Sequence, residues 1–345
     1  MDDAHRRRHS QARVDAIRAL LERDGNGAVL LSSRANVAWA TAGGQHHIVT
    51  SSETGVGALL ITGRAAWFLA PNIERARLAD EELAGLDLEV VEFDWWQEGG
   101  LEGTAGRLLS DGGASRRILD DAALEPDLLA LRSRLDPLDQ ERLAQLGRVA
   151  AGAVDDALAA ADVGMREDEL GAALLGRLAG ARAPVVLVAA DERIPRYRHP
   201  LPSSLPIRRR VMLVLVAEAW GLHVAVTRFR CWQDEPPDLA ARWDAVGAVQ
   251  RAMTEASVPG ATLGQVFEVA QRVYAEHGHP DAWREHHQGG TIAYRGRERV
   301  AVPGDPTRIE AGMALAWNPS IAGVKVEDTV IVQADGTHRV VTASA

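Results

Sequence analysis

The chain has 345 residues, of which 46% are hydrophobic, and this length is sufficient for two domains with separate cores. Its formal net charge of -10 disfavours nonspecific binding to nucleic acid, and no apolar run approaches the roughly 20 residues that cross a membrane. The single cysteine, Cys231, excludes an internal disulfide framework and a cysteine-rich metal site, so we expect a cytoplasmic protein.

The first part of the chain alternates predicted helices with predicted strands. The expected elements are a helix at 10–24, strands at 28–31, 57–62 and 65–69, a helix at 73–83, strands at 88–93 and 117–119, and a helix at 126–134. The second and third strands are expected to form a hairpin. This alternation is typical of an α/β domain. Asp136 can cap a helix and Pro137 can open one, so we place two domains at 1–135 and 136–345.

The second part predicts longer helices and a hairpin, followed by a strand-rich end. The expected elements are a helix at 138–161, a helix after the segment 163–170, strands at 184–189, 210–219 and 224–232, helices at 237–257 and 263–277, and several strands from residue 290 onward. Two helices and a hairpin are thus followed by two helices and further strands. This order indicates an approximate internal duplication.

Three short segments, taken together with this order of elements, resemble a known superfamily. They are GMREDEL at 164–170, Thr227-Arg228 at the end of a hairpin, and VEDTV at 326–330. In this order they resemble the pita-bread superfamily of creatinases, prolidases and aminopeptidases P. Residues 35–44 are similar to a segment of the N-terminal domain that creatinases and prolidases carry. The resemblance implies an α/β N-terminal domain, an α+β pita-bread C-terminal domain and a homodimer.

Metallopeptidases of this superfamily hold two metal ions with two aspartates, one histidine and two glutamates, an oxygen-rich set that suits hard dications. The resemblance places Val214 and Ala225 at the two aspartate positions, and neither side chain can bind a metal. The first glutamate position falls on Asn318, so only Glu327 keeps a glutamate. We therefore expect neither a dinuclear metal centre nor a cofactor.

Two neighbouring histidines are the first candidates for acid–base chemistry. The histidine position of the superfamily falls on His287, with His286 as the alternative, and two glycines follow that permit close approach of the backbone to a ligand. Imidazole exchanges a proton near neutral pH without large tuning, so His287 is the expected acid or base. His199 resembles the histidine that lines the substrate pocket of the superfamily. Exposed loops would also explain these imidazoles.

Lys325 is the only lysine of the chain and stands two positions before Glu327. Residues two apart on a strand project to the same face, so we expect an ion pair that holds substrate charges or shifts a pKa. An ordinary surface pair of little energetic value is the alternative. Asn318 can orient a carbonyl or amidine group, because its amide both donates and accepts. The remaining substrate-binding candidates are Trp317, His223 and Arg228.

Three functions remain open. The first is a metal-independent enzyme with the logic of creatinase, which hydrolyses a C–N bond in a small amino-acid-like, amidine or amide substrate. The second is a noncatalytic peptidase-like binding module, which the apolar Val214 and Ala225 favour. The third is a mononuclear metallohydrolase similar to Xaa-Pro peptidases, with one ion held by His287, Glu327 and His223. We expect a small-molecule substrate and neither nucleic acid nor membrane as a partner.

Overall fold

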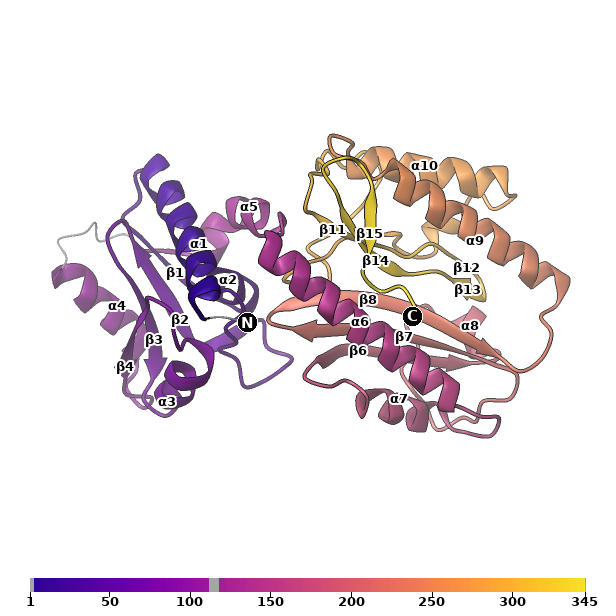
Figure 1. Ribbon diagram of the computed structural model, residues 1–345, viewed down its shortest axis with the longest axis horizontal. Coiled ribbons are helices and arrows are strands. Elements are labelled where there is room, and N and C mark those ends of the chain that lie inside the picture. The colour runs from indigo at the N-terminus through magenta and orange to yellow at the C-terminus, as the bar shows by residue number, and fades with distance from the viewer. Residues whose placement is uncertain (1–2, 112–117, 345) are drawn as a thin grey trace. The chain divides into compact units, whose positions relative to one another are not determined.

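The computed structural model describes residues 3–111 and 118–344, and the chain divides into two compact units, Met1–Arg132 and Ser133–Ala345 (Figure 1). The boundary between the units lies slightly before residue 135, where the sequence suggested it. Among the helices of the described residues, none combines the length and the apolar character that a membrane crossing requires.

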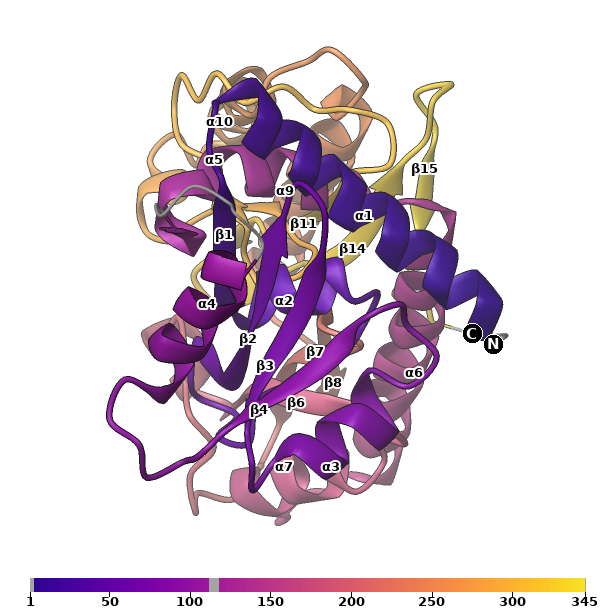
Figure 2. The ribbon, with the colours of Figure 1, turned by 90° about the vertical axis from the view of Figure 1, so that its left-hand side faces the viewer.

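The N-terminal unit is built on a five-stranded sheet in the order β4-β3-β2-β1-β5. Its strands are β1 (Ala28–Ser33), β2 (Thr54–Thr62), β3 (Ala66–Pro71), β4 (Glu89–Phe93) and β5 (Ile118–Asp120). Figure 2 shows β4, β3, β2 and β1 side by side. The expected hairpin is confirmed, because β2 and β3 are antiparallel and Leu60 pairs with Trp67. Arg117, which the sequence places at the start of β5, lies outside the described residues.

Helices cover both faces of this sheet. They are α1 (Asp3–Arg23), α2 (Arg34–Ala40), α3 (Arg75–Arg77) with the π-helix that follows it (Leu78–Glu82), α4 (Gly100–Asp111) and α5 (Asp121–Arg132). Leu109 of α4 joins Leu60 and Leu69 in one apolar cluster, whereas α1 and α2 lie on the other side (Figure 1). Two expected helix starts are wrong. α1 already begins at Asp3, and α5 begins before Pro126, which lies inside the helix.

An antiparallel sheet of three strands follows the first two helices of the C-terminal unit. It consists of β6 (Arg182–Ala190), β7 (Arg210–Ala219) and β8 (Leu222–Cys231), in that order. The long helix α6 (Pro137–Ala160) packs along β7 and β8, and α7 (Glu167–Leu175) packs against β6 (Figure 1). The expected cap is confirmed, since the Asp136 carboxylate accepts a 3.0 Å hydrogen bond from the N–H of Asp139 and Pro137 is the first helical residue.

A second sheet, of five strands, has the order β10-β9-β11-β14-β15. Its strands are β9 (Gly289–Thr291), β10 (Arg299–Val300), β11 (Ala314–Trp317), β14 (Asp328–Val332) and β15 (His338–Val340). A separate two-stranded ribbon consists of β12 (Ser320–Ile321) and β13 (Val324–Lys325), and the unit also has two short helical turns, α8 (Arg193–Arg196) and η2 (Ala282–Arg284). Helices α9 (Pro237–Ala256) and α10 (Leu263–Glu276) join this sheet in one apolar core through Val249, Phe267 and Leu315. The two sheets meet where Thr227 of β8 pairs with Glu327.

Candidate functional site

Two glycines fix the path of the chain directly after the histidine pair. Gly289 and Gly290 have φ angles of 96° and 156°. A Cβ atom on Gly289 would lie 2.1 Å from the carbonyl oxygen of Ala316, and one on Gly290 would lie 2.0 Å from that of Arg299. Any side chain at these positions would therefore push β9 away from β10 and β11. The close approach is between strands, whereas the sequence suggested an approach to a ligand.

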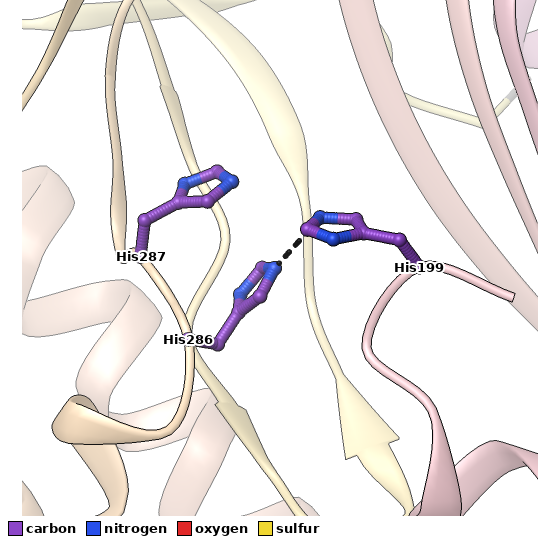
Figure 3. A group of neighbouring side chains, drawn as sticks. All are labelled: His199, His286 and His287. Atoms are coloured by element: carbon purple, nitrogen blue, oxygen red, sulfur yellow. Dashed lines mark hydrogen bonds between the residues drawn. The ribbon is translucent and has the colours of Figure 1, made fainter.

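Three histidines from two separate segments face a common space (Figure 3). His286 and His287 lie between η2 and β9, and His199 lies in the loop between α8 and β7. One ring nitrogen of each histidine lies within 4.8 Å of the other two, and the Nε2 atoms of His199 and His286 are 3.2 Å apart. The rings of His286 and His287 stack with their centroids 4.4 Å apart. His286 is buried, so an exposed loop does not explain it.

A buried ion group surrounds the carboxylate of Glu327. Lys325 Nζ lies 2.9 Å from its Oε2, and a terminal nitrogen of Arg297 lies 2.6 Å from its Oε1. Thr227 Oγ1 donates a 2.7 Å hydrogen bond to Oε2 as well. Only 2% of Glu327 and 7% of Lys325 are exposed. The expected pair of Lys325 and Glu327 thus forms in the interior, and the alternative of a surface pair is wrong.

The two cations hold Glu327 in its ionised form. Burial alone would raise the pKa of Glu327, but the charges of Lys325 and Arg297 outweigh this effect and hold the pKa at about 2. At neutral pH the group of three side chains therefore carries two positive charges and one negative charge. The group therefore has a net positive charge.

The three imidazoles are neutral at neutral pH. Burial lowers the pKa of His286 to about 3, and Lys325 adds to this effect. Burial and then the charge of Arg297 lower the pKa of His287 to about 4. Burial and Lys325 also lower the pKa of His199. The lowered pKa of His287 disfavours the sequence prediction that this ring exchanges a proton near pH 7.

A small cavity is lined by Lys325 of the ion group and by His286 of the histidine cluster. Its volume is about 20 Å³, enough for a water-sized ligand, and Ser320, Lys325, Arg198 and His286 are among its lining residues. Several buried polar atoms have no hydrogen-bond partner among the described residues, namely Asn318 Oδ1, Ser320 Oγ and the Nδ1 atoms of His286 and His287. Buried polar atoms without partners are costly, so these atoms are candidates for hydrogen bonds to water or a ligand.

A pair of metal ions does not fit the residues around Glu327. Val214 pairs with Thr227 across β7 and β8, so its side chain lies on the same face as those of Thr227 and Ala225, the face that meets Glu327. Val214 and Ala225 are buried and offer no ligand atom. Both oxygens of Glu327 contact protein cations. A metal ion there would face positive charges in place of carboxylates, so the superfamily's two-metal chemistry is not assigned to this chain.

Two expected substrate-binding residues have structural roles. Trp317 is fully buried in the core of the second sheet, and its Nε1 donates a 2.9 Å hydrogen bond to Ser257 Oγ. The expectation that Trp317 lines the pocket is therefore corrected. Arg228 donates to the carboxylate of Asp328 at 2.8 Å and to the carbonyl oxygen of Thr342 at 2.7 Å. Arg228 thus connects β8 with Thr342 and the start of β14, and neither contact indicates that it binds a ligand.

His223 is also separate from the histidine cluster. Its Nε2 lies 3.9 Å from the carboxylate of Glu218 across the turn of β7 and β8, and its backbone N–H donates to the carbonyl oxygen of Ala293 at 2.7 Å. The cluster of possible metal ligands among the described residues contains His199, His286 and His287 and does not include His223. The expectation that His223 assists His287 and Glu327 is thus corrected.

Sequence reasoning missed two residues of the site. Arg297 stands where relatives carry a histidine before a glutamate, and the sequence suggested only the loss of a proton shuttle there. The structure instead places its guanidinium against Glu327. Ser320 pairs with Lys325 in the ribbon of β12 and β13 and lines the cavity. A lone serine in a loop-like segment gave no signal for this position.

Comparisons with known proteins agree with the fold described above. The model of metallopeptidase family M24 matches residues 141–334, more than half of the chain. The Xaa-Pro dipeptidase of Pyrococcus furiosus is 23% identical over 317 residues, which cover 84% of this chain and 88% of that protein. The prolidase from Pyrococcus horikoshii OT3 superposes with a TM-score of 0.78 at 19% identity, covering 97% of this chain and 99% of that one. The X-Pro aminopeptidase from Thermotoga maritima MSB8 gives a TM-score of 0.78 at 15% identity, covering 96% and 97%. The expected pita-bread fold is confirmed, and the chain belongs to metallopeptidase family M24.

Proposed function

We propose that the protein hydrolyses the C–N bond of a small dipeptide-like substrate with a free carboxylate, an Xaa-Pro dipeptide being the first candidate. The observation that carries this proposal is the net positive group of Glu327, Lys325 and Arg297 beside three neutral imidazoles. The relatives named above are an Xaa-Pro dipeptidase, a prolidase and an X-Pro aminopeptidase. A peptide bond is therefore favoured over the amidine substrates that the comparison with creatinase suggested.

The charges and unpaired polar atoms of the site support an amino-acid-like substrate. Glu327 offsets only one of the two cations that contact it, and Arg198 lines the cavity together with Lys325. A substrate carboxylate would meet this positive charge in a partly buried position, where electrostatic attraction is stronger than in bulk water. Asn318 Oδ1 is an acceptor without a partner, which suits an N–H or ammonium group.

Hydrolysis requires a water molecule that loses a proton as it attacks the carbonyl carbon. Of the three imidazoles, that of His286 lines the cavity, so an attacking water held there would lie beside the histidine cluster. The proton that the water loses passes to the amine nitrogen as the C–N bond breaks. One carboxylate and one amine are released.

The test compares Xaa-Pro dipeptides with the same dipeptides amidated at their C terminus. Free dipeptides should show the higher kcat/KM, because amidation removes the carboxylate that the cations attract. Lys325→Arg should raise KM, since a guanidinium is bulkier than an ammonium and does not fit the same cavity. Arg134→Lys changes an exposed pair with Glu310 and should leave both kinetic constants unchanged. Chromatography of the released proline measures turnover.

The outcomes separate catalysis from charge recognition. Absence of turnover on every dipeptide, with and without added Zn²⁺, would refute a hydrolytic role. Equal kcat/KM for the free and the amidated dipeptides would refute the assignment of the cations to a substrate carboxylate.

A noncatalytic binding module is the second candidate, and Val214 and Ala225 favour it. Both side chains are buried and apolar on the face that meets Glu327, as expected where a catalytic centre has been lost. Calorimetric binding of a dipeptide that remains intact after long incubation would support this function over hydrolysis.

A further inference from the structure

Three imidazoles with no carboxylate among them form a donor set different from the one that the superfamily uses. We propose that His199, His286 and His287 together bind one first-row transition metal ion, with Zn²⁺ as the best match. The proposal rests on the proposed function, because it specifies how the attacking water is activated. Their ligand nitrogens already gather in one place, on two segments far apart in the chain (Figure 3).

The spacing of the nitrogens is close to that of a tetrahedral zinc site. Zn–N bonds of about 2.0–2.1 Å place two ligand nitrogens about 3.3 Å apart. The Nε2 atoms of His199 and His286 are 3.2 Å apart. Because all three ligand atoms lie within 4.8 Å of one another, the widest gap has to close by about 1.5 Å at most. His199 is an exposed loop residue, so rotation of its side chain can supply this movement.

A shared hydrogen bond lies at the proposed metal position. His199 and His286 contact one another through their Nε2 atoms, so a single proton lies where the metal would bind. Metal binding would displace this proton. The Nδ1 atoms of His286 and His287 are buried and have no hydrogen-bond partner among the described residues, so no hydrogen bond of the fold depends on these two nitrogens.

The donor set selects among metals. Imidazole suits Zn²⁺, Cu²⁺ and Ni²⁺, whereas Mg²⁺, Ca²⁺ and Mn²⁺ prefer carboxylate, carbonyl and water oxygens. The cluster contains only histidines. We therefore expect strong discrimination against hard cations.

Three protein ligands leave the fourth tetrahedral position open, which is typical of catalytic zinc. His286 lines the cavity of about 20 Å³, which has room for one water molecule. A zinc-bound water has a pKa of about 7 and attacks as hydroxide. A metal ion held by the three rings would therefore supply the activation of the attacking water.

The nearby cations set a limit on affinity. Lys325 and Arg297 repel a dication, and Glu327 offsets only one of their two charges. The site should therefore bind Zn²⁺ more weakly than a site with a carboxylate ligand. A substrate carboxylate on the same cations would remove this repulsion.

The experiment titrates the chelator-stripped full chain with Zn²⁺ in a calorimeter and with Co²⁺ in a visible spectrometer, without substrate. We expect one Zn²⁺ per chain and the intense visible absorption of tetrahedral Co²⁺. His286→Ala should weaken Zn²⁺ binding by more than about 100-fold, because loss of a ligand exceeds the cost of losing an outer partner. His199→Ala is a second variant, in an exposed loop, that does not disturb the core. His277→Ala, exposed at the end of α10, is the matched control and should bind Zn²⁺ as the wild type does.

Each outcome decides between the two proposals. Absence of Zn²⁺ binding, two ions per chain, or unchanged affinity in both His286→Ala and His199→Ala would overturn the metal site. A chain that binds one Zn²⁺ but hydrolyses no dipeptide would keep the metal site and refute the proposed function. Undiminished hydrolysis by the zinc-free chain would keep the proposed function and refute the role of the metal.

Discussion

Glu327 is only 2% exposed, and a carboxylate in such a position needs compensating charge because burial removes its hydration. Arg297 and Lys325 provide this charge, one at each carboxylate oxygen. A single cation would neutralise the carboxylate. The second cation leaves the group with a net positive charge.

Removal of Arg297 should be costly for stability. Arg297→Met leaves one oxygen of the buried Glu327 carboxylate without its charged donor and should lower the free energy of unfolding by about 1.5–3 kcal/mol. Arg134→Met is a matched control, because Arg134 also lies 2.6 Å from a glutamate, Glu310, but both side chains are exposed. The control should lose less than about 1 kcal/mol. Urea denaturation measures both values, and equal losses would show that burial does not set the energy of the Glu327 group.

His46 of the N-terminal unit should make stability depend on pH. Burial lowers its pKa to about 4, although its Nε2 contacts the carbonyl oxygen of Ser32. The unfolded ring titrates near its ordinary pKa of 6.5, so the unfolded chain takes up a proton first as the pH falls. The stabilising contribution is complete above about pH 6.5 and falls by about 3 kcal/mol as the pH decreases to about 4.

The control variants isolate this titration. His46→Gln should flatten the dependence of the unfolding free energy on pH between about 7 and 4, whereas His277→Gln at an exposed position should not. Urea denaturation across this range measures the slope. A slope that His46→Gln leaves unchanged would mean that the buried ring does not titrate as inferred.

At the residue scale, the sequence predicts contacts between near neighbours better than contacts between distant segments. The spacing of Lys325 and Glu327 predicted their ion pair, but Arg297 joins it from 30 residues away. Trp317 shows a different error. It precedes Asn318 directly at the end of β11, and adjacent strand residues point to opposite faces. Assigning both residues to one pocket contradicted this alternation.

Strand β9 depends on the absence of a side chain at Gly289. Gly289→Ala would place a Cβ atom against the carbonyl oxygen of Ala316. This oxygen belongs to the backbone, so no side-chain rotation can relieve the overlap. Gly260→Ala is a matched control, because the φ angles are 96° and 94° but nothing lies within 4 Å of a Cβ on Gly260. Both variants carry left-handed strain of about 1–2 kcal/mol, and Gly289→Ala should lose a further 1–3 kcal/mol or so. Equal losses in urea denaturation would refute the steric role of Gly289.

Helices with a clear apolar period and a capping residue were the elements best predicted. Helix α6 shows this, since Asp136 and Pro137 mark its start in the sequence and in the structure. Helix α2 was missed because all the residues 35–40 are buried, so it lacks the polar face that amphipathic periodicity requires. The sequence predicts too short a helix α5, because a proline favours the first turn of a helix whereas Pro126 lies inside α5.

At the scale of the whole molecule, the order of elements and a few short motifs were sufficient to predict the pita-bread fold. The homodimer that the same resemblance implies stays a prediction. Light scattering at micromolar concentrations should give twice the mass of one chain. A mass of one chain throughout that range would refute the homodimer.

Whether Glu327 holds protein cations or metal ions is decided most directly by X-ray anomalous scattering from crystals soaked in Mn²⁺. Mn²⁺ prefers carboxylate oxygens, so it would occupy a two-metal centre of the superfamily type if one existed here. We predict no anomalous peak within bonding distance of Glu327 or Asn318, with Lys325 and Arg297 remaining on the carboxylate. An Mn²⁺ peak bonded to Glu327, with either cation displaced, would contradict this prediction and restore a metal centre at that carboxylate.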